Sequence, residues 1–153
     1  MSYHIVTTRV SAQPIAAVRR SVLVREIGRT WKPALDLVWD FLRRREGLRA
    51  DGHNCFLYHH PARSDEPMDI DFGVQVVRTF EDEGEVTCTQ TPAGEVAMTN
   101  HVGSYDKLGA AHDAIHSWRA ESGRVFAGWS WEIYGDWTDD LTKLETQVVY
   151  LLS

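Results

Sequence analysis

The chain has 153 residues, of which 43% are hydrophobic and 25% are charged, with a formal net charge of −6. This length allows one domain with a substantial core, or two small fused halves. The acidic balance argues against direct nucleic-acid binding, which needs clustered cations. The basic run 43–45 fits the last turn of a helix, where positive charge complements the helix dipole.

Cysteine usage and hydropathy indicate the compartment. Cys55 and Cys88 stand far apart without the spacing of a metal site, which favours two reduced thiols in a cytosolic protein. The N-terminus shows no signal pattern, and no apolar run approaches the length of a membrane span. We therefore expect a cytoplasmic protein that does not enter membranes.

The first half of the chain predicts four strands and one helix. Alternating and β-branched residues between turn signals predict strands over 3–10, 15–24, 54–60 and 68–80. A helix is expected over 31–46, with Thr30 as its N-cap, Pro33 in its first turn and Gly47 after its end. The apolar residues at the spacing of one buried helix face are Ala34, Leu35, Val38, Phe41 and Leu42.

The second half repeats this order after the acidic segment 81–85. Strands are expected over 86–90, 95–101, from Trp129 to Tyr134, and 143–152. Between the second and third of these, Ser104 begins a helix that runs to about Glu121 and is closed by Gly123. The residues expected to face inward from this helix are Leu108, Ala111, Ile115 and Trp118.

Two halves with the same order of elements indicate a duplicated unit. We expect a single α+β domain over 1–153, built from two tandem β-β-α-β-β modules at 1–82 and 83–153. A pseudo-twofold arrangement would extend one antiparallel sheet and leave a groove where the modules meet. Ligand sites are common at such junctions.

Glu132 is the unusual residue of the strand that starts at Trp129. Alternation places Trp129 and Trp131 on one face of the sheet, mainly as core, and Glu132 with Tyr134 on the other. A carboxylate buried without a partner would have a raised pKa and would attract a cation. The alternative is that Glu132 has no binding role and is an exposed carboxylate on the solvated face of the sheet.

The motifs from Pro92 onward resemble those of the GyrI-like small-molecule-binding domain, which is also the effector-binding half of AraC-type and MerR-type multidrug regulators. The segments that carry this resemblance are Pro92-Ala-Gly, Val96-Ala-Met, His101-Val-Gly-Ser-Tyr105-Asp-Lys-Leu108, the helix ending near Trp118, Glu132-Ile-Tyr134 and Leu144-Glu145-Thr. The resemblance covers nearly the whole chain. Two departures are Ser104, where the family usually has proline, and the lack of a DNA-binding domain, so we expect a stand-alone domain.

The resemblance implies tandem strand-helix-strand-strand modules and a groove that binds hydrophobic, cationic compounds. Glu132 matches the family's buried groove glutamate, and Glu145 matches a second acidic position on the closing strand. Phe56, Tyr58 and Tyr134 are expected to form the groove walls. Trp31 and Trp39 are candidates for the rim, and Tyr105 could line the rim or pack against its helix.

Neither a metal nor another cofactor is expected. His112 and His116 are one helical turn apart, but no glutamate follows the first as in a zinc-protease helix. The sequence also contains no Ser-His-Asp order and no phosphate-cradling glycine loop.

Three functions therefore remain open. The favoured one is binding or sequestration of flat, hydrophobic, cationic small molecules. A second is hydrolysis of electrophilic small molecules, in which Glu132 acts as general base with Tyr134 or Glu145 assisting. The third is a protein partner, as for a gyrase-inhibitor-type interaction module, which would require an exposed acidic face and an occluded groove.

Overall fold

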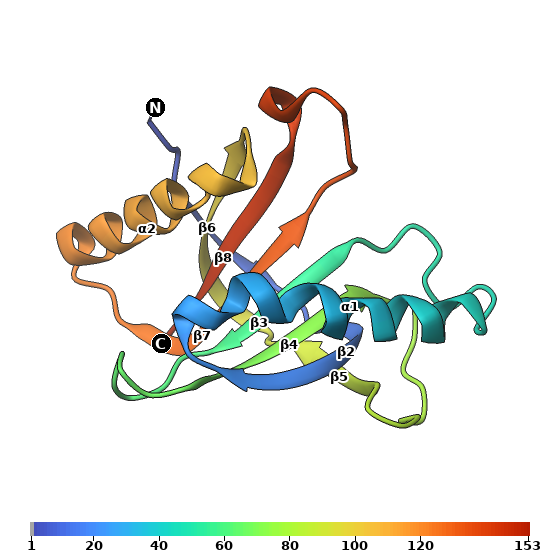
Figure 1. The fold of residues 1–153 in the computed structure, drawn as a ribbon. Coiled ribbons are helices and arrows are strands. Elements are labelled where there is room, and N and C mark those ends of the chain that lie inside the picture. Colours follow the sequence, from blue (N-terminus) through green and yellow to red (C-terminus); the bar gives the residue numbers. More distant parts are fainter. Residues whose placement is uncertain (1) are drawn as a thin grey trace.

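The computed structural model describes residues 2–153 as one eight-stranded antiparallel sheet with two helices (Figure 1). The α+β class and the duplicated order of elements are as the sequence predicted. The order of strands across the sheet is β1-β6-β8-β7-β3-β4-β2-β5. The strands are β1 (Val6–Val10), β2 (Gln13–Val22), β3 (Asn54–His59), β4 (Met68–Gln75), β5 (Thr87–Thr91), β6 (Gly94–Val102), β7 (Phe126–Tyr134) and β8 (Glu145–Leu152).

The two halves of the chain exchange their first strands. β1 pairs with β6 of the second half, and β5 pairs with β2 of the first half. The division of the sequence near residue 82 therefore does not coincide with the division of the sheet. The two halves meet directly where β3 pairs with β7, with Phe56 opposite Glu132.

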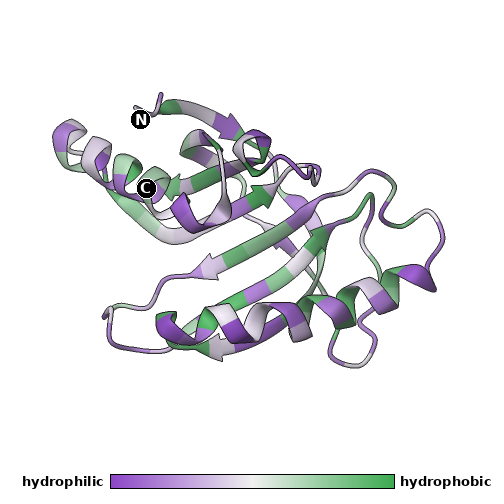
Figure 2. Cartoon of the chain, turned by 45° about the horizontal axis from the view of Figure 1, so that its top comes forward, coloured by the Kyte–Doolittle hydropathy of each residue, from purple (hydrophilic) through white to green (hydrophobic). Residues whose placement is uncertain are grey.

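Both helices cover the same face of the sheet. α1 (Ile27–Arg43) packs on β2 and β4, and α2 (Gly109–Ser122) packs on β6 and β8 (Figure 1). Each helix therefore covers one half, and the paired strands β3 and β7 run between them. Hydrophobic and hydrophilic residues alternate along α1 in Figure 2, in keeping with one buried face. The stripe predicted for α1 is buried in full.

α1 begins earlier than the sequence predicted. A 3-10 turn, η1 (Val24–Glu26), leads directly into the helix, and the Glu26 carboxylate accepts a hydrogen bond from the Leu23 backbone N–H at 2.9 Å. The prediction of Thr30 as N-cap was wrong, because Thr30 lies inside the helix and donates its hydroxyl to the Glu26 carbonyl at 2.7 Å. Pro33 consequently lies beyond the first turn.

The start of α2 also differs, and its end does not. Ser104 precedes a 3-10 turn, η2 (Tyr105–Lys107), and makes no side-chain cap. Gly123 closes α2 with a φ of 74°, the left-handed conformation that glycine adopts without strain. A last 3-10 turn, η3 (Leu141–Lys143), includes Lys143, where the final strand was expected to begin, and β8 starts two residues later at Glu145.

Three clusters form the core. One lies between α1 and the sheet, and another between α2 and the sheet. The third lies on the opposite face, where the curled sheet brings residues from β2, β3, β6, β7 and β8 together around Leu57 and Trp131. Trp131 is buried there and Trp129 packs against the cluster, as alternation of β7 requires.

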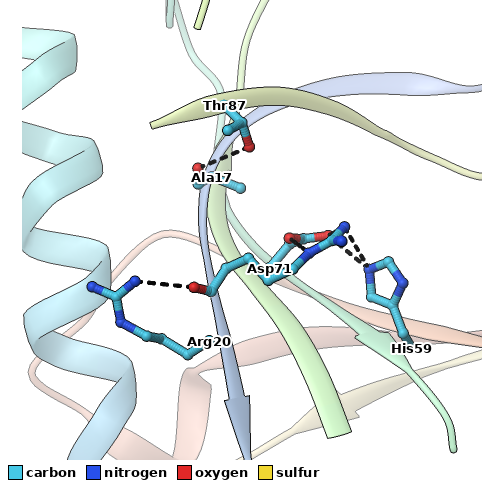
Figure 3. Close-up of polar contacts among 6 residues, drawn as sticks. Ala17, Arg20, His59, Asp71 and Thr87 are labelled. Atoms are coloured by element: carbon cyan, nitrogen blue, oxygen red, sulfur yellow. Dashed lines mark hydrogen bonds and ion pairs between the residues drawn. The ribbon is translucent and has the colours of Figure 1, made fainter. Parts of the chain in front are cut away.

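One buried carboxylate on this opposite face is fully paired. Asp71 on β4 is 1% exposed and binds Arg19 through both of its oxygens, at 2.9 and 3.1 Å. His59 contacts the same carboxylate at 2.7 Å (Figure 3). Burial raises the pKa of Asp71, but hydrogen bonds from His59 and Arg19 outweigh burial, so the net pKa is lowered.

Candidate ligand-binding site

A pocket of about 630 Å³ opens between the two helices, above the junction of β3 and β7. α1 supplies one wall and the start of the α2 region supplies the other, while the strands supply the floor. The lining side chains of the helical walls are Ile27, Trp31, Leu35, Trp39, Tyr105 and Leu108, and those of the floor are Phe56, Tyr58, Glu132 and Tyr134. Seven of the eight residues that the sequence nominated for the ligand site are therefore found together here.

Aromatic rings form a continuous lining. Phe56 packs edge-on against Tyr134 with ring centroids 5.0 Å apart, and Tyr105 packs edge-on against Tyr134 at 5.5 Å. Trp31 lies 6.2 Å from Phe56 and is 37% exposed, so it stands at the mouth. Trp39 is held by a hydrogen bond from its indole N–H to the Asn54 side chain at 3.0 Å. The pocket therefore offers several ring faces fixed by mutual packing.

The Glu132 carboxylate lies at the base of the pocket and is 5% exposed. Its Oε1 accepts hydrogen bonds from the hydroxyls of Tyr58 and Tyr134, both at 2.5 Å. Its Oε2 lies 2.7 Å from Nε2 of His112 on α2. Both oxygens are therefore hydrogen-bonded, and within residues 2–153 the one basic side chain that contacts the carboxylate, His112, is not among the residues that line the pocket.

The expectation of a raised pKa for Glu132 was wrong. Burial does raise it, but the hydrogen bond and charge of His112, together with the two tyrosine hydroxyls, outweigh burial and lower the net pKa. A raised pKa would hold only for a buried carboxylate without partners, and Glu132 has three. The pKa values of Tyr58 and Tyr134 are raised well above the ordinary value, first by burial, so both remain protonated donors.

His112 is the site residue that the sequence analysis missed. Its Nδ1 lies 2.7 Å from the Tyr150 hydroxyl, which in turn lies 3.3 Å from Nε2 of His116. A signal was available, because His112 follows Leu108 by one helical turn and so shares the inward side of α2. From the sequence, His112 was a candidate only as a metal ligand, together with His116.

Glu145 is the nominated residue that the structure does not bring to the pocket. β8 pairs with β7 so that Thr146 faces Tyr134 and Val148 faces Glu132. Alternation then directs Glu145 to the opposite face. Its exposed carboxylate accepts a hydrogen bond from Asn100 at 3.1 Å.

Two loops complete the rim and were not foreseen. The loop after β7 places Asp136 and Trp137 at the mouth, and Trp137 is 66% exposed. The loop before β3 contributes Arg49, whose guanidinium stacks 4.8 Å over the Trp39 ring, and His53, which lies 3.6 Å from Asp136. The rim therefore combines polar side chains with the exposed rings of Trp31 and Trp137, and the interior is aromatic.

A second hollow, of about 710 Å³, lies between the end of α1 and the segment 78–83. Arg44 and Arg45 both bind Glu83 there, at 2.7 and 2.8 Å. Two arginines thus share one carboxylate there, and Phe80 is the aromatic side chain among the residues that line this hollow.

Residues 2–153 contain neither a metal-type cluster nor a membrane-spanning helix. No three His, Cys, Asp or Glu side chains converge there as they would around a metal ion. No helix there has the length and apolar character required to cross a membrane.

The chain matches a known domain family and several solved structures. A profile described as the GyrI-like small molecule binding domain matches residues 1–149. The crystal structure of the EcmrR C-terminal domain superposes with a TM-score of 0.82 at 20% identity, covering 100% of this chain and 99% of that one. No protein of curated function matches by sequence.

Two further solved structures share the fold at lower identity. SAV2435 bound to tetraphenylphosphonium superposes with a TM-score of 0.72 at 10% identity, covering 100% of this chain and 94% of that one. A hydrolase from Listeria innocua superposes with a TM-score of 0.59 at 11% identity, covering 97% and 91%. At these identities the likeness concerns the fold.

Proposed function

The chain belongs to the GyrI-like family of small-molecule-binding domains, and on that premise we propose that its pocket binds flat, hydrophobic cations. The observation that carries this proposal is the Glu132 carboxylate at the base of an aromatic pocket, where no lysine or arginine among the described residues 2–153 forms an ion pair with it. The carboxylate selects charge, and the rings select shape.

The lining favours a large aromatic ligand. A volume of about 630 Å³ lies within the range of small-molecule sites. Ring faces from Trp31, Phe56 and Tyr134 offer stacking and cation–π contacts of about 1 kcal/mol each. Tetraphenylphosphonium, the ligand bound to SAV2435, has this chemistry and serves as a probe.

Electrostatics supports a cation over an anion. At about 4 Å and an effective dielectric near 20, a unit cation and a carboxylate attract by roughly 4 kcal/mol before desolvation. Glu132 stays ionised near neutral pH because its pKa is lowered. The rim also contains the positively charged Arg49. Its guanidinium donates to the Gly52 carbonyl at 2.9 Å, so this hydrogen bond is made to the backbone of the rim and not to Glu132.

Hydrolysis fits the geometry less well. A carboxylate whose pKa is lowered and whose two oxygens are both hydrogen-bonded is a weak general base. An interaction module with an occluded groove fits less well too, since the mouth residues Trp31 and Trp137 are 37% and 66% exposed. We therefore place binding or sequestration first, in the cytoplasm, with no role in direct nucleic-acid contact.

Tryptophan fluorescence titration with tetraphenylphosphonium tests the proposal, because three tryptophans line the pocket. The wild-type protein should show saturable quenching in the micromolar range, and Glu132→Gln should bind at least tenfold more weakly. Glu145→Gln is the matched control, since it removes the same charge from the opposite face and should bind like wild type. Equal binding by wild type and Glu132→Gln would contradict the proposal. Product analysis of the wild-type mixtures with electrophilic substrates would reveal turnover.

A further inference from the structure

The protein itself uses most of the hydrogen-bonding capacity of the Glu132 carboxylate. An ionised carboxylate offers about four lone-pair positions, two on each oxygen. Within residues 2–153, the hydroxyls of Tyr58 and Tyr134 occupy both positions of Oε1, and Nε2 of His112 occupies one position of Oε2. At most one acceptor position therefore remains, and it lies on the oxygen that His112 binds.

The two tyrosines fill the oxygen of Glu132 that a ligand would otherwise use. Tyr58 and Tyr134 both line the pocket, whereas His112 reaches Oε2 from α2 and is not part of the lining. A ligand in the pocket consequently meets the negative charge of Glu132 beside two hydroxyls that already donate to Oε1. The charge acts on the ligand, but Oε1 has no position left to accept a hydrogen from it.

Other acceptors in the pocket are also engaged or lie at its mouth. The side-chain oxygen of Asn54 accepts the indole N–H of Trp39 at 3.0 Å, and the Gly52 carbonyl accepts from Arg49 at 2.9 Å. The second carboxylate of the lining belongs to Asp136, whose side chain is 94% exposed. The interior therefore attracts positive charge while offering few places for an N–H group to donate.

This combination distinguishes two kinds of monovalent cation. A primary ammonium group carries three N–H donors and is strongly hydrated. Inside the pocket at most one of these donors can reach Glu132, and a buried donor without an acceptor costs the hydrogen bond that it made to water. A quaternary ammonium or phosphonium ion carries the same charge without N–H groups, and it can lie against the aromatic ring faces.

We propose that the pocket selects cations by their hydrogen-bond donors, preferring quaternary ammonium or phosphonium ions to protonated amines of similar shape, because Tyr58 and Tyr134 occupy Oε1 of Glu132. The inference rests on the proposed function of the same pocket. The two tyrosines are then specificity-determining residues through their hydroxyls as well as walls through their rings.

The test compares three ligands that share one flat aromatic group: pyrenylmethyl-trimethylammonium, pyrenylmethylammonium and the neutral pyrenylmethanol. Calorimetric titration at pH 7 keeps both ammonium compounds singly charged, because alkylammonium groups titrate well above neutrality. Wild type should bind the trimethylammonium compound about tenfold more tightly than the primary ammonium compound, the factor expected for roughly one unsatisfied donor. It should also bind the trimethylammonium compound more tightly than the alcohol, which lacks the charge.

Two variants separate the role of the hydroxyls from that of the three added methyl groups. Tyr58→Phe and Tyr134→Phe each free one position on Oε1 and keep the aromatic ring. In each, the preference for the trimethylammonium compound should fall to about threefold or less, because the primary ammonium can now donate to Oε1. Tyr3→Phe is the control, since it removes a hydroxyl that contacts His101 outside the pocket lining and should keep the wild-type preference. Circular dichroism shows which variants are folded.

The outcomes distinguish this inference from the proposed function. A preference that stays near tenfold in the folded tyrosine variants would assign the selectivity to the methyl groups and overturn the inference. Equal binding of the two ammonium compounds by wild type would overturn it too, and the proposed function would still stand if Glu132→Gln weakened both. If wild type binds neither cation more tightly than the alcohol, the proposed function itself fails, and this inference with it.

Discussion

Replacing Tyr58 with phenylalanine isolates what one hydroxyl contributes to the buried carboxylate. The change removes a 2.5 Å hydrogen bond to Glu132 and leaves the ring in place. A hydrogen bond to a charged group contributes about 1.5–3 kcal/mol, against about 1 kcal/mol for a neutral pair. We therefore expect Tyr58→Phe to lower the free energy of unfolding by about 2 kcal/mol at pH 7, or about 4–8 °C in Tm for a chain of this size.

The same variant should show a dependence on pH whose sign follows from the lowered pKa of Glu132. Stability from a carboxylate with a depressed folded-state pKa is present above its unfolded value, near 4.5, and is lost as the pH falls through the folded value. The difference between wild type and Tyr58→Phe should therefore shrink toward about 1 kcal/mol or less in strong acid, where the bond becomes neutral.

Urea denaturation at a series of pH values, followed by circular dichroism, measures both effects. Tyr105→Phe is the matched control, because within residues 2–153 its hydroxyl makes no hydrogen bond and it should unfold like wild type. A loss of less than about 0.5 kcal/mol for Tyr58→Phe at pH 7, or a loss that does not change with pH, would refute the description of Glu132 as an ionised acceptor.

Two further predictions concern a close backbone contact beside the pocket and an ion pair on the opposite face of the sheet. Gly52→Ala places a Cβ 1.9 Å from the Gln75 carbonyl oxygen and should lower the free energy of unfolding, measured by urea denaturation, by about 3 kcal/mol. The control Gly28→Ala in α1 meets no neighbouring atom and should be neutral or stabilising by up to about 1 kcal/mol. Similar effects of the two changes would show that the close backbone approach at Gly52 is absent. Asp71→Asn leaves Arg19 and His59 without their shared carboxylate and should lower the free energy of unfolding by about 3 kcal/mol at pH 7. The loss should be smaller in acid, because the pKa of Asp71 is lowered in the folded protein. A loss of stability that does not depend on pH would exclude the ion pair as its cause.

Local periodicity explains what the sequence could predict. The stripe of α1 and the alternation of β7 depend only on the geometry of one element, and both are found in the structure. Helix starts were less accurate, because Thr30 resembles an N-cap while the actual start depends on the capping contact between Leu23 and Glu26. Strand ends likewise depend on partners: β4 ends at Gln75, and shortly after it the Val77 N–H donates to the Leu48 carbonyl, which lies outside the sheet.

The parts of the site that escaped prediction depend on how elements dock. His112 meets Glu132 only because α2 lies across β8 toward β7, an arrangement that the sequence does not contain in any one segment. Glu145 was nominated from the resemblance, and the register of β8 against β7 directs it away from the pocket. Loop residues such as Trp137 were missed for the same reason, since nothing local indicates where a loop returns.

The exchange of first strands has a mechanical consequence for the pocket. β1 and β2 are joined by two residues only, as are β5 and β6, so the outer edges of the two halves are tied together by two short crossings. The two halves are thus connected along the β3–β7 pair and also at the outer strands of the sheet. This double connection opposes a hinge motion that would separate them. A ligand must therefore enter past the side chains of the rim, and the strands that carry Phe56 and Glu132 form a rigid seat rather than a hinge.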